Sequence, residues 1–263
     1  MESWPKTYKL IQYDELDSTN SEAKRLAFKD EINTCILSRI QNKGKGSRGR
    51  NWNSGSKNLT ASFLIYPNGN LIEFSHRTFI ASLALFDSLI YSGIENKDLI
   101  LKWPNDVLLK HKKISGILLE SVANKSSKKT ALIIGIGVNL FSYPKNLSQQ
   151  NKLKIKPTSL YSVLGKNTPS PDQMLTYIAN SLHSWEKKYN SEGFGFIKKA
   201  WLNFSYSIGK KLEVEFKGKK LEGSFFGISD NGSLKILIEK KVIELNVGDV
   251  FFLINENFSN EIC

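Results

Sequence analysis

The chain has 263 residues, of which 40% are hydrophobic. A chain of this length and apolarity can bury enough surface to offset the entropy lost on folding, which excludes intrinsic disorder. The length predicts one or two domains. No apolar run reaches the roughly 18 residues that span a bilayer, and the N-terminal segment lacks the apolar core of a targeting sequence. The two cysteines, Cys35 and Cys263, form neither a disulfide framework nor a zinc site, so we expect a protein of the reducing cytoplasm.

The first part of the chain reads as strands separated by one short helix and one long loop. Extended patterns predict strands over residues 7–13, 34–41 and 59–66. Thr19, followed three residues later by Glu22, has the form of a capping box and predicts a helix to about Phe28. Residues 42–58 are rich in Gly, Asn, Ser and cations, and a loop of this length indicates a function.

The middle of the chain predicts a helix capped by Ser75 and a strand over residues 99–103 that Pro104 ends. Two apolar runs, 114–122 and 131–139, predict a buried hairpin. The sequence Ser170-Pro171-Asp172 predicts the start of a helix that reaches residue 189, and a second helix follows over residues 194–204. From Ser207 short strands alternate with turns, which predicts a small barrel, and residues 255–263 are predicted to be a frayed tail.

Positive charge is concentrated in the first part of the chain. Residues 1–207 carry 29 basic and 16 acidic side chains, a net of +13, and these belong to a whole chain with 37 Lys and Arg, 25 Asp and Glu and a formal net charge of +12. Most of these cations are lysines, which commonly serve solubility alone. One segment is different, because no acidic residue lies between Glu31 and Glu73 while Arg48 and Arg50 stand two residues apart there.

The glycine-rich loop matches the dinucleotide fingerprint only in the spacing of its glycines. Its Gly44-x-Gly46-x-x-Gly49 pattern fits the spacing, but a strand rather than a helix follows, so no helix N-terminus can receive a pyrophosphate. What remains is a set of free backbone amides among cations, followed by Trp52. Such a loop can cradle a phosphate or carboxylate under an aromatic lid. The alternative is a solvated basic hairpin loop.

Three further clusters carry polar groups at strand ends. Residues 102–106 (KWPND) place a cation, a carboxamide and a carboxylate together, although Pro, Asn and Asp also favour an ordinary turn. Lys113 enters a buried strand just before Gly116, where something is expected to approach closely, although a solvent-facing strand end would look the same. Asn139 ends an apolar strand, either to read a hydrogen-bonding edge or simply to cap it.

Taken in order, these segments resemble the biotin–protein ligases over nearly all of the chain. The matching motifs are DSTN at 17–20, Gln41 followed by GKGSRGRNW at 44–52, KWPND at 102–106, KKISGIL at 112–118 and GIGVN at 135–139. The resemblance implies an α+β fold, with a mixed sheet flanked by helices and related to the class II tRNA synthetase core, followed by an SH3-like β-barrel. It implies a catalytic domain at 1–206, a C-terminal domain at 207–254 and a tail at 255–263. Because the catalytic pattern begins within the first twenty residues, we expect no DNA-binding domain and no repressor role.

The resemblance implies a reaction in two steps. Biotin and ATP first form biotinyl-5'-adenylate, and biotin is then transferred to a lysine of a biotin carboxyl carrier protein. Mg2+ is expected to bind together with ATP, and its protein ligands are not assigned. Implied biotin-binding residues are Ser18, Thr19, Asn20, Gln41, Gly44, Lys45, Gly46, Ser47, Lys113 and Gly116. Implied ATP-binding residues are Arg48, Arg50, Trp52, Lys102, Asn105, Asp106 and Asn139. Implied catalytic residues are Lys113, Arg48, Arg50 and Asp106. Family members often carry arginines where this chain has Lys45 and Ser47. The loop of this chain therefore offers fewer guanidinium groups with which to retain the adenylate.

Partners and alternatives follow from the same resemblance. The expected partners are biotin, ATP and the carrier domain of acetyl-CoA carboxylase or a related biotin enzyme, with no DNA and no membrane, for a monomer or a homodimer. A lipoate–protein ligase is the nearest alternative, since it shares the fold and the adenylation chemistry but lacks this combination of loop and KWPND motif. From a different class, a basic nucleic-acid-binding protein is favoured by net charge, but the chain lacks a regular aromatic platform and an Arg-rich recognition helix.

Overall fold

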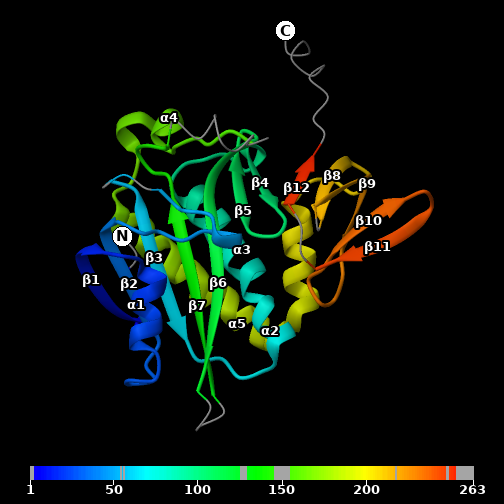
Figure 1. Ribbon diagram of the computed structural model, residues 1–263. Coiled ribbons are helices and arrows are strands. Elements are labelled where there is room, and N and C mark those ends of the chain that lie inside the picture. Colours follow the sequence, from blue (N-terminus) through cyan, green and yellow to red (C-terminus); the bar gives the residue numbers. More distant parts are fainter. Residues whose placement is uncertain are drawn as a thin grey trace.

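A computed structural model describes residues 3–53, 55, 57–124, 129–144, 155–216, 218–246 and 249–252 (Figure 1). Its larger part is built on a seven-stranded sheet in the order β1-β2-β3-β7-β6-β5-β4. Its strands are β1 (Lys9–Leu16), β2 (Thr34–Gln41), β3 (Leu59–Ile65), β4 (Leu99–Lys102), β5 (Asp106–Leu109), β6 (Lys112–Ala123) and β7 (Thr130–Val138). The β1–β2 pair is parallel and all the other pairs are antiparallel, so the predicted mixed sheet and the predicted hairpin of β6 and β7 are both confirmed.

Helices cover both faces of this sheet. On one face lie α3 (Arg77–Tyr91) and α5 (Pro171–Asn203), and on the other lies the short helix α1 (Thr19–Leu26) (Figure 1). Because successive side chains of a strand point to opposite faces, Cys35 and Leu37 pack in the large core under α3 and α5. Ile36, between them, packs with Ala23 of α1 in a separate small cluster.

Helix α5 begins where the sequence predicts. Ser170 caps it by accepting a hydrogen bond from the Gln173 backbone N–H at 3.2 Å, the Gln173 side chain bonds back to the Ser170 N–H, and Pro171 stands at the first position. The two helices predicted over this stretch form one element that bends at Gly193, whose φ of 75° is open to glycine at little cost. The bend allows the end of α5 to reach the C-terminal part of the chain.

Two predicted helix starts were wrong. The N-cap of α1 is Ser18 rather than Thr19, and no capping box forms, because the Thr19 hydroxyl and backbone N–H both lie within hydrogen-bonding distance of Gln41 Oε1. Ser75 does not cap a helix but ends a short one, α2 (Leu71–Ser75), which Asn70 and Glu73 cap. Strand β5, helix α4 (Tyr161–Leu164) and the 3-10 turns η1 (Ser47–Gly49), η2 (Asn96–Asp98) and η3 (Gly165–Asn167) had not been predicted.

The C-terminal part is a five-stranded antiparallel sheet, in the order β11-β10-β9-β8-β12, beside the end of α5 (Figure 1). Its strands are β8 (Lys211–Phe216), β9 (Lys219–Ile228), β10 (Leu234–Ile238), β11 (Lys241–Leu245) and β12 (Asp249–Phe252). The predicted change to short strands after Ser207 is confirmed, whereas closure into an SH3-like barrel stays a prediction. The predicted tail, residues 255–263, lies outside the described residues.

The turn between β9 and β10 holds the two parts together. Trp103, in the KWPND segment, donates its indole N–H to the Gly232 carbonyl oxygen at 3.0 Å. His76 Nε2 lies 3.2 Å from the Asp230 carbonyl oxygen, and the Asp230 carboxylate pairs with Lys198 of α5. Across the described residues, no helix is long and apolar enough to cross a membrane.

Candidate functional site

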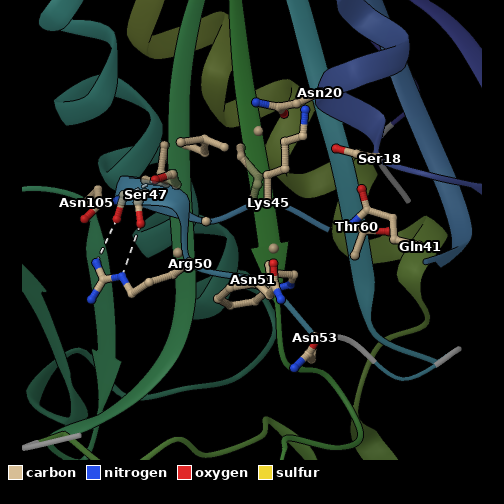
Figure 2. Close-up of a pocket in the computed structure, with 18 of the residues that line it drawn as sticks. Ser18, Asn20, Gln41, Lys45, Ser47, Arg50, Asn51, Asn53, Thr60 and Asn105 are labelled. Carbon is tan, nitrogen blue, oxygen red and sulfur yellow. Dashed lines mark hydrogen bonds between the residues drawn. The ribbon is translucent and has the colours of Figure 1, made fainter. Parts of the chain in front are cut away.

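A cavity of about 310 Å³ opens over strands β3, β6 and β7, beneath the glycine-rich loop (Figure 2). This volume is at the small end of the range for sites that hold a metabolite-sized molecule. The cavity is lined by Ser18, Thr19, Asn20, Gln41, Lys45, Gly46, Ser47, Arg50, Asn51, Trp52, Asn53, Thr60, Ala61, Asn105, Lys113, Gly116, Ile117, Leu118, Gly135, Ile136, Gly137, Asn139, Pro144, Ile155 and Pro157. Segments far apart in the sequence therefore meet around one space.

One wall of the cavity is polar and buried. Ser18, Thr19 and Asn20, at the start of α1, are only 2–4% exposed. Gln41 Oε1 accepts the Thr19 backbone N–H at 2.7 Å, and Ser62 Oγ lies 2.7 Å from Thr19 Oγ1 and 2.6 Å from Asn20 Oδ1. Buried polar groups joined in this way are held in one geometry, so the wall presents a fixed set of donors and acceptors.

A charged pair stands behind Asn20. Its Nδ2 donates to Glu120 Oε2 at 2.8 Å, and Lys24 Nζ donates to Glu120 Oε1 at 2.6 Å. Burial would raise the pKa of the Glu120 carboxyl, but the hydrogen bonds from Lys24 and Asn20 outweigh it and the pKa is lowered. Lys45, from the loop, extends its side chain toward Asn20 (Figure 2). This end of the cavity therefore combines neutral amides with an ionised carboxylate and two cations.

The other end carries a buried carboxylate between two lysines. Lys113 Nζ lies 2.5 Å from Asp106 Oδ1, and Lys102 Nζ lies 3.2 Å from Asp106 Oδ2. Burial raises the pKa of Asp106, but the two lysine charges outweigh it and hold the pKa at about 2. The Lys102 side chain is 6% exposed and that of Lys113 is 31% exposed. Lys113 is therefore the cation of this triad that an anion in the cavity can reach.

The glycine-rich loop closes over the cavity through its own hydrogen bonds. The Trp52 N–H donates to the Gly44 carbonyl at 2.9 Å, and the Gly46 N–H donates to the Arg50 carbonyl at 2.7 Å. The Arg50 guanidinium bonds Ser47, with Nη2 donating to Oγ at 2.8 Å and Nε donating to the carbonyl at 3.2 Å (Figure 2). The loop that the sequence predicts to be irregular is therefore a tight hairpin.

Glycines in the strands leave room for the side chains above them. A Cβ at Gly137 would lie 2.3 Å from the Trp52 indole, and a Cβ at Gly116 would lie 3.1 Å from the same ring. A Cβ at Gly135 would lie 2.2 Å from Asn20 Oδ1. Each glycine of the strand floor is thus matched to one side chain of the cavity, and the Trp52 indole packs against β6 and β7.

Buried polar atoms without partners gather at this site. Among the described residues, the buried side-chain atoms lacking a hydrogen bond include Trp52 Nε1 and Asn139 Oδ1, and both residues line the cavity. Native proteins leave few such atoms unsatisfied, and those that remain often mark a place where a ligand binds. A ligand that supplies an acceptor for the indole and a donor for the carboxamide would satisfy both.

The structure brings most of the expected site residues to the cavity. Those that line it are Ser18, Thr19, Asn20, Gln41, Lys45, Gly46, Ser47, Arg50, Trp52, Asn105, Lys113, Gly116 and Asn139. Four others do not line it. Asp106 and Lys102 lie behind Lys113, Gly44 packs against the Trp52 carbonyl, and Arg48 is exposed with a φ of 59°.

Sequence reasoning missed several residues of the site. Asn51, Asn53, Thr60 and the cavity-lining prolines carry no pattern that distinguishes them from loop or strand residues. Glu120 was missed as well, because its partner Asn20 is 100 residues away in the sequence. Only an acidic residue inside an apolar strand could have drawn attention to it.

A protein-held metal site is not indicated. Among the described residues, no group of three or more His, Cys, Asp or Glu side chains is arranged to hold a metal ion. Asp106, a buried carboxylate beside the cavity, already forms ion pairs with two lysines. A magnesium ion that enters with a nucleotide would depend mainly on phosphate oxygens, as is usual for this ion.

Comparisons with known proteins agree with this geometry. A model of the biotin/lipoate A/B protein ligase family matches residues 14–139. A biotin–[acetyl-CoA-carboxylase] ligase of Paracoccus denitrificans is 33% identical over 218 residues, 83% of this chain and 90% of that protein. A bifunctional ligase/repressor of Bacillus subtilis is 29% identical over 92% of this chain and 73% of its own length. The structure of a biotin protein ligase from Aquifex aeolicus in complex with biotin and ATP has a TM-score of 0.76 at 27% identity, covering 93% of this chain and 99% of that one.

Proposed function

The chain belongs to the biotin protein ligase family, and from this premise we propose that it activates biotin with ATP and attaches it to a lysine of a biotin carboxyl carrier protein. The observation that carries the proposal is that one cavity has a polar wall at Asn20 and a lysine–carboxylate triad at Lys113. A cyclic urea suits the first end, and a carboxylate meeting a phosphate suits the second. Lipoate has no ureido ring with which to use the polar wall.

The first half-reaction joins two anions. An oxygen of the biotin carboxylate attacks the α-phosphorus of ATP, a P–O bond forms, and the bond to the departing pyrophosphate breaks. Repulsion between the two anions amounts to several kcal/mol at intermediate dielectric. Lys113, held in place by Asp106, offsets this repulsion, and Arg50 adds a second positive charge from the loop.

The second half-reaction transfers biotin. The neutral amine of a carrier lysine attacks the acyl carbon of the adenylate, a C–N bond forms, AMP leaves with the bonding electrons, and the amine gives up a proton to solvent. Positioning of the two reacting groups supplies much of the acceleration. The cavity mouth beside the loop is the route by which we propose that the carrier lysine enters.

Roles of the lining residues follow their places in the cavity. We assign the biotin ring to Ser18, Thr19, Asn20 and Gln41, with Lys45, Gly46 and Ser47 above it and Gly116 below. We assign ATP to Arg50, Trp52, Asn105 and Asn139, since Trp52 Nε1 and Asn139 Oδ1 are the unpaired atoms that a purine base could satisfy. Lys102 and Asp106 orient Lys113 from behind, and Arg48 would need a change of backbone conformation to reach the phosphates.

The remaining parts of the proposal concern the whole chain. We propose residues 1–206 as the catalytic domain and residues 207–254 as a C-terminal domain with an SH3-like barrel, supported by its five short antiparallel strands. ATP and the carrier domain of acetyl-CoA carboxylase or a related biotin enzyme are cytoplasmic molecules, so we propose that the protein acts there.

Exchange between labelled pyrophosphate and ATP tests the adenylation step without any carrier. We expect exchange that requires biotin and Mg2+ and that lipoate does not support. Exchange driven by lipoate and not by biotin would instead assign the protein to the lipoate branch, and exchange with neither acid would overturn the proposal.

A further inference from the structure

The residue that controls the polar wall does not itself line the cavity. Glu120, on β6, has a side chain 24% exposed and stands behind Asn20, which is 4% exposed. Its Oε2 accepts from Asn20 Nδ2 at 2.8 Å, and its Oε1 accepts from Lys24 Nζ at 2.6 Å. Nothing in the sequence motifs or in the roles proposed above uses Glu120.

An ionised carboxylate accepts hydrogen bonds and cannot donate them. Glu120 therefore turns the nitrogen of the Asn20 carboxamide toward itself and the oxygen toward Ser62. Close packing keeps the carboxamide in place, since Asn20 Oδ1 lies where a Cβ of Gly135 would be, at 2.2 Å. The carboxamide can exchange its two ends, but it has no room to move away.

The orientation of the Asn20 carboxamide determines which neighbouring groups donate and which accept hydrogen bonds. Asn20 Oδ1 only accepts, so the Ser62 hydroxyl, 2.6 Å away, must donate to it. Ser62 Oγ, 2.7 Å from Thr19 Oγ1, then has no proton left for Thr19, whose own hydroxyl donates to Gln41 Oε1 at 3.1 Å. Gln41 Oε1 keeps the Thr19 backbone N–H at 2.7 Å, which leaves the Gln41 amide nitrogen as a donor for other groups.

We propose that Glu120 is a positioning residue for biotin, because it fixes which atoms of the Asn20–Ser62–Thr19 wall donate and which accept. The ureido ring presents one carbonyl acceptor and two N–H donors, so a wall of reversed polarity would set donor against donor. This inference rests on the proposed function, since it takes the ligand of the wall to be biotin.

Glu120→Gln tests the proposal because glutamine keeps the shape of the glutamate side chain but can present a donor, as well as an acceptor, to Asn20. Lys24 still needs an acceptor and, being charged, takes the glutamine oxygen. The glutamine NH2 group then faces Asn20 and turns its carboxamide over. We expect biotin to bind about tenfold more weakly by calorimetry, which corresponds to ~1.4 kcal/mol. Pyrophosphate release at saturating biotin should stay within about twofold of wild type, because Glu120 touches no reacting atom.

A second substitution separates orientation from simple damage. In the double variant Lys24→Met, Glu120→Gln the ammonium that bonds residue 120 is removed, so the glutamine oxygen can return to Asn20 Nδ2. We expect the double variant to bind biotin more tightly than Glu120→Gln alone. Glu22→Gln is the matched control on the same helix, where Glu22 pairs with Arg25 outside the cavity, and its affinity should equal that of wild type.

The outcomes distinguish the inference from the function on which it rests. If the wild type binds no biotin, the proposed function itself fails. If the wild type binds biotin and folded Glu120→Gln binds it equally well, only the positioning role is refuted. A double variant weaker than Glu120→Gln, with thermal unfolding unchanged, would also refute it, because the loss would then not depend on the orientation of Asn20.

Discussion

The carboxylate of Asp106 is shared by two lysines that differ in what they can reach. Lys102 is enclosed, whereas the Lys113 side chain is 31% exposed and faces the cavity. A pKa of about 2 keeps Asp106 ionised, so the ammonium of Lys113 is held in place before any ligand arrives. Such prior placement of charge is the usual way in which an enzyme stabilises a developing anion.

Removal of the Lys113 ammonium should therefore lower activity. We expect Lys113→Ala to reduce biotin-dependent pyrophosphate release by roughly 10- to 100-fold, since a charge-assisted contact contributes about 1.5–3 kcal/mol. Lys112→Ala, which removes an exposed neighbouring lysine, is the control and should keep wild-type release. Wild-type release by folded Lys113→Ala, with unchanged circular dichroism, would refute the role of Lys113.

Asp106 also links stability to pH. Its pKa is lowered in the fold, so its contribution to stability is fully present above the ordinary value of 3.8 and is lost as pH falls through about 2. We expect Asp106→Asn to lower the unfolding free energy by about 3 kcal/mol at pH 7, because two lysines lose their counter-charge. The deficit relative to wild type should narrow toward pH 2 in urea unfolding.

The matched control for this pH dependence is Asp172→Asn. Asp172 forms an ion pair with Arg39 in which both side chains are at least one-third exposed, so its loss should cost less than about 1 kcal/mol. A deficit for Asp106→Asn that stays constant from pH 7 to pH 3 and on to pH 2 would contradict the assigned pairing.

Ser47 offers a neutral hydroxyl at a loop position where the resemblance described above implies an arginine. Here it accepts a hydrogen bond from Arg50, which commits one guanidinium edge within the loop. Ser47→Arg should add a forked donor for the adenylate phosphate and slow the release of preformed biotinyl-adenylate by about tenfold, or ~1.4 kcal/mol. Release that is unchanged or faster in a dissociation assay would mean that another cation already holds the phosphate.

At the scale of elements, the glycine floor and the loop fit each other. A Cβ at Gly137, in the middle strands of the sheet, would lie 2.3 Å from the Trp52 indole, so Gly137→Ala should push Trp52 away. We expect ATP to bind at least about tenfold more weakly to this variant, with a change in tryptophan fluorescence. Gly195→Ala is the control, since nothing lies within 4 Å of its added methyl group. Unaltered ATP affinity in folded Gly137→Ala would show that Trp52 does not contact the base.

The elements of the catalytic part could largely be predicted from periodicity. The strand over residues 34–41 has the predicted bounds, and the β6–β7 hairpin forms as expected, because apolar runs bounded by turns determine strands locally. Helix starts were less predictable. Thr19 has the sequence of a cap, but Gln41, 22 residues away, takes its hydroxyl and its N–H. Tertiary hydrogen bonds of this kind leave no local pattern.

The site could be predicted in part for a similar reason. Gly44, Trp52, Lys113 and Asn139 lie in motifs, and the structure brings three of them to the cavity wall. Glu120 was invisible because its role depends on the pairing that places β6 beside β7 and close to α1. The backbone hydrogen bonds within the loop also could not be predicted, since they come from a conformation that glycine composition alone does not specify.

On the scale of the whole molecule, the KWPND segment joins the catalytic part to the C-terminal sheet. Trp103 reaches Gly232 from the strand end next to Asp106, and this contact adds to those that Asp230 makes with His76 and Lys198. Trp103→Phe keeps most of the packing and removes this hydrogen bond, a loss of about 1 kcal/mol. We expect faster amide hydrogen exchange in β9 and β10 while the central sheet keeps its protection.

Trp185→Phe is the control for this comparison, because Trp185 donates to Asp87 within the α3–α5 packing. Its loss should affect the helices and leave exchange in the C-terminal strands unchanged. Equal exchange in β9 and β10 for wild type and Trp103→Phe would show that the indole bond does not hold the C-terminal sheet.

The net charge of +12 fits the same account without a nucleic-acid partner. Cations that line the cavity, such as Lys45, Arg50 and Lys113, are placed to meet ATP and the biotin carboxylate. A nucleic-acid-binding protein would instead bind duplex DNA with an affinity that falls steeply as salt concentration rises. We do not expect such binding for this protein.

Mass spectrometry of a carrier domain after incubation with the protein, biotin and MgATP directly tests whether the protein attaches biotin to a carrier lysine. We expect a mass increase of one biotinyl group on the acceptor lysine. We expect no addition without ATP, and none on a carrier whose acceptor lysine is replaced by arginine. A carrier that stays unmodified while a known biotin protein ligase modifies it under the same conditions would contradict the account.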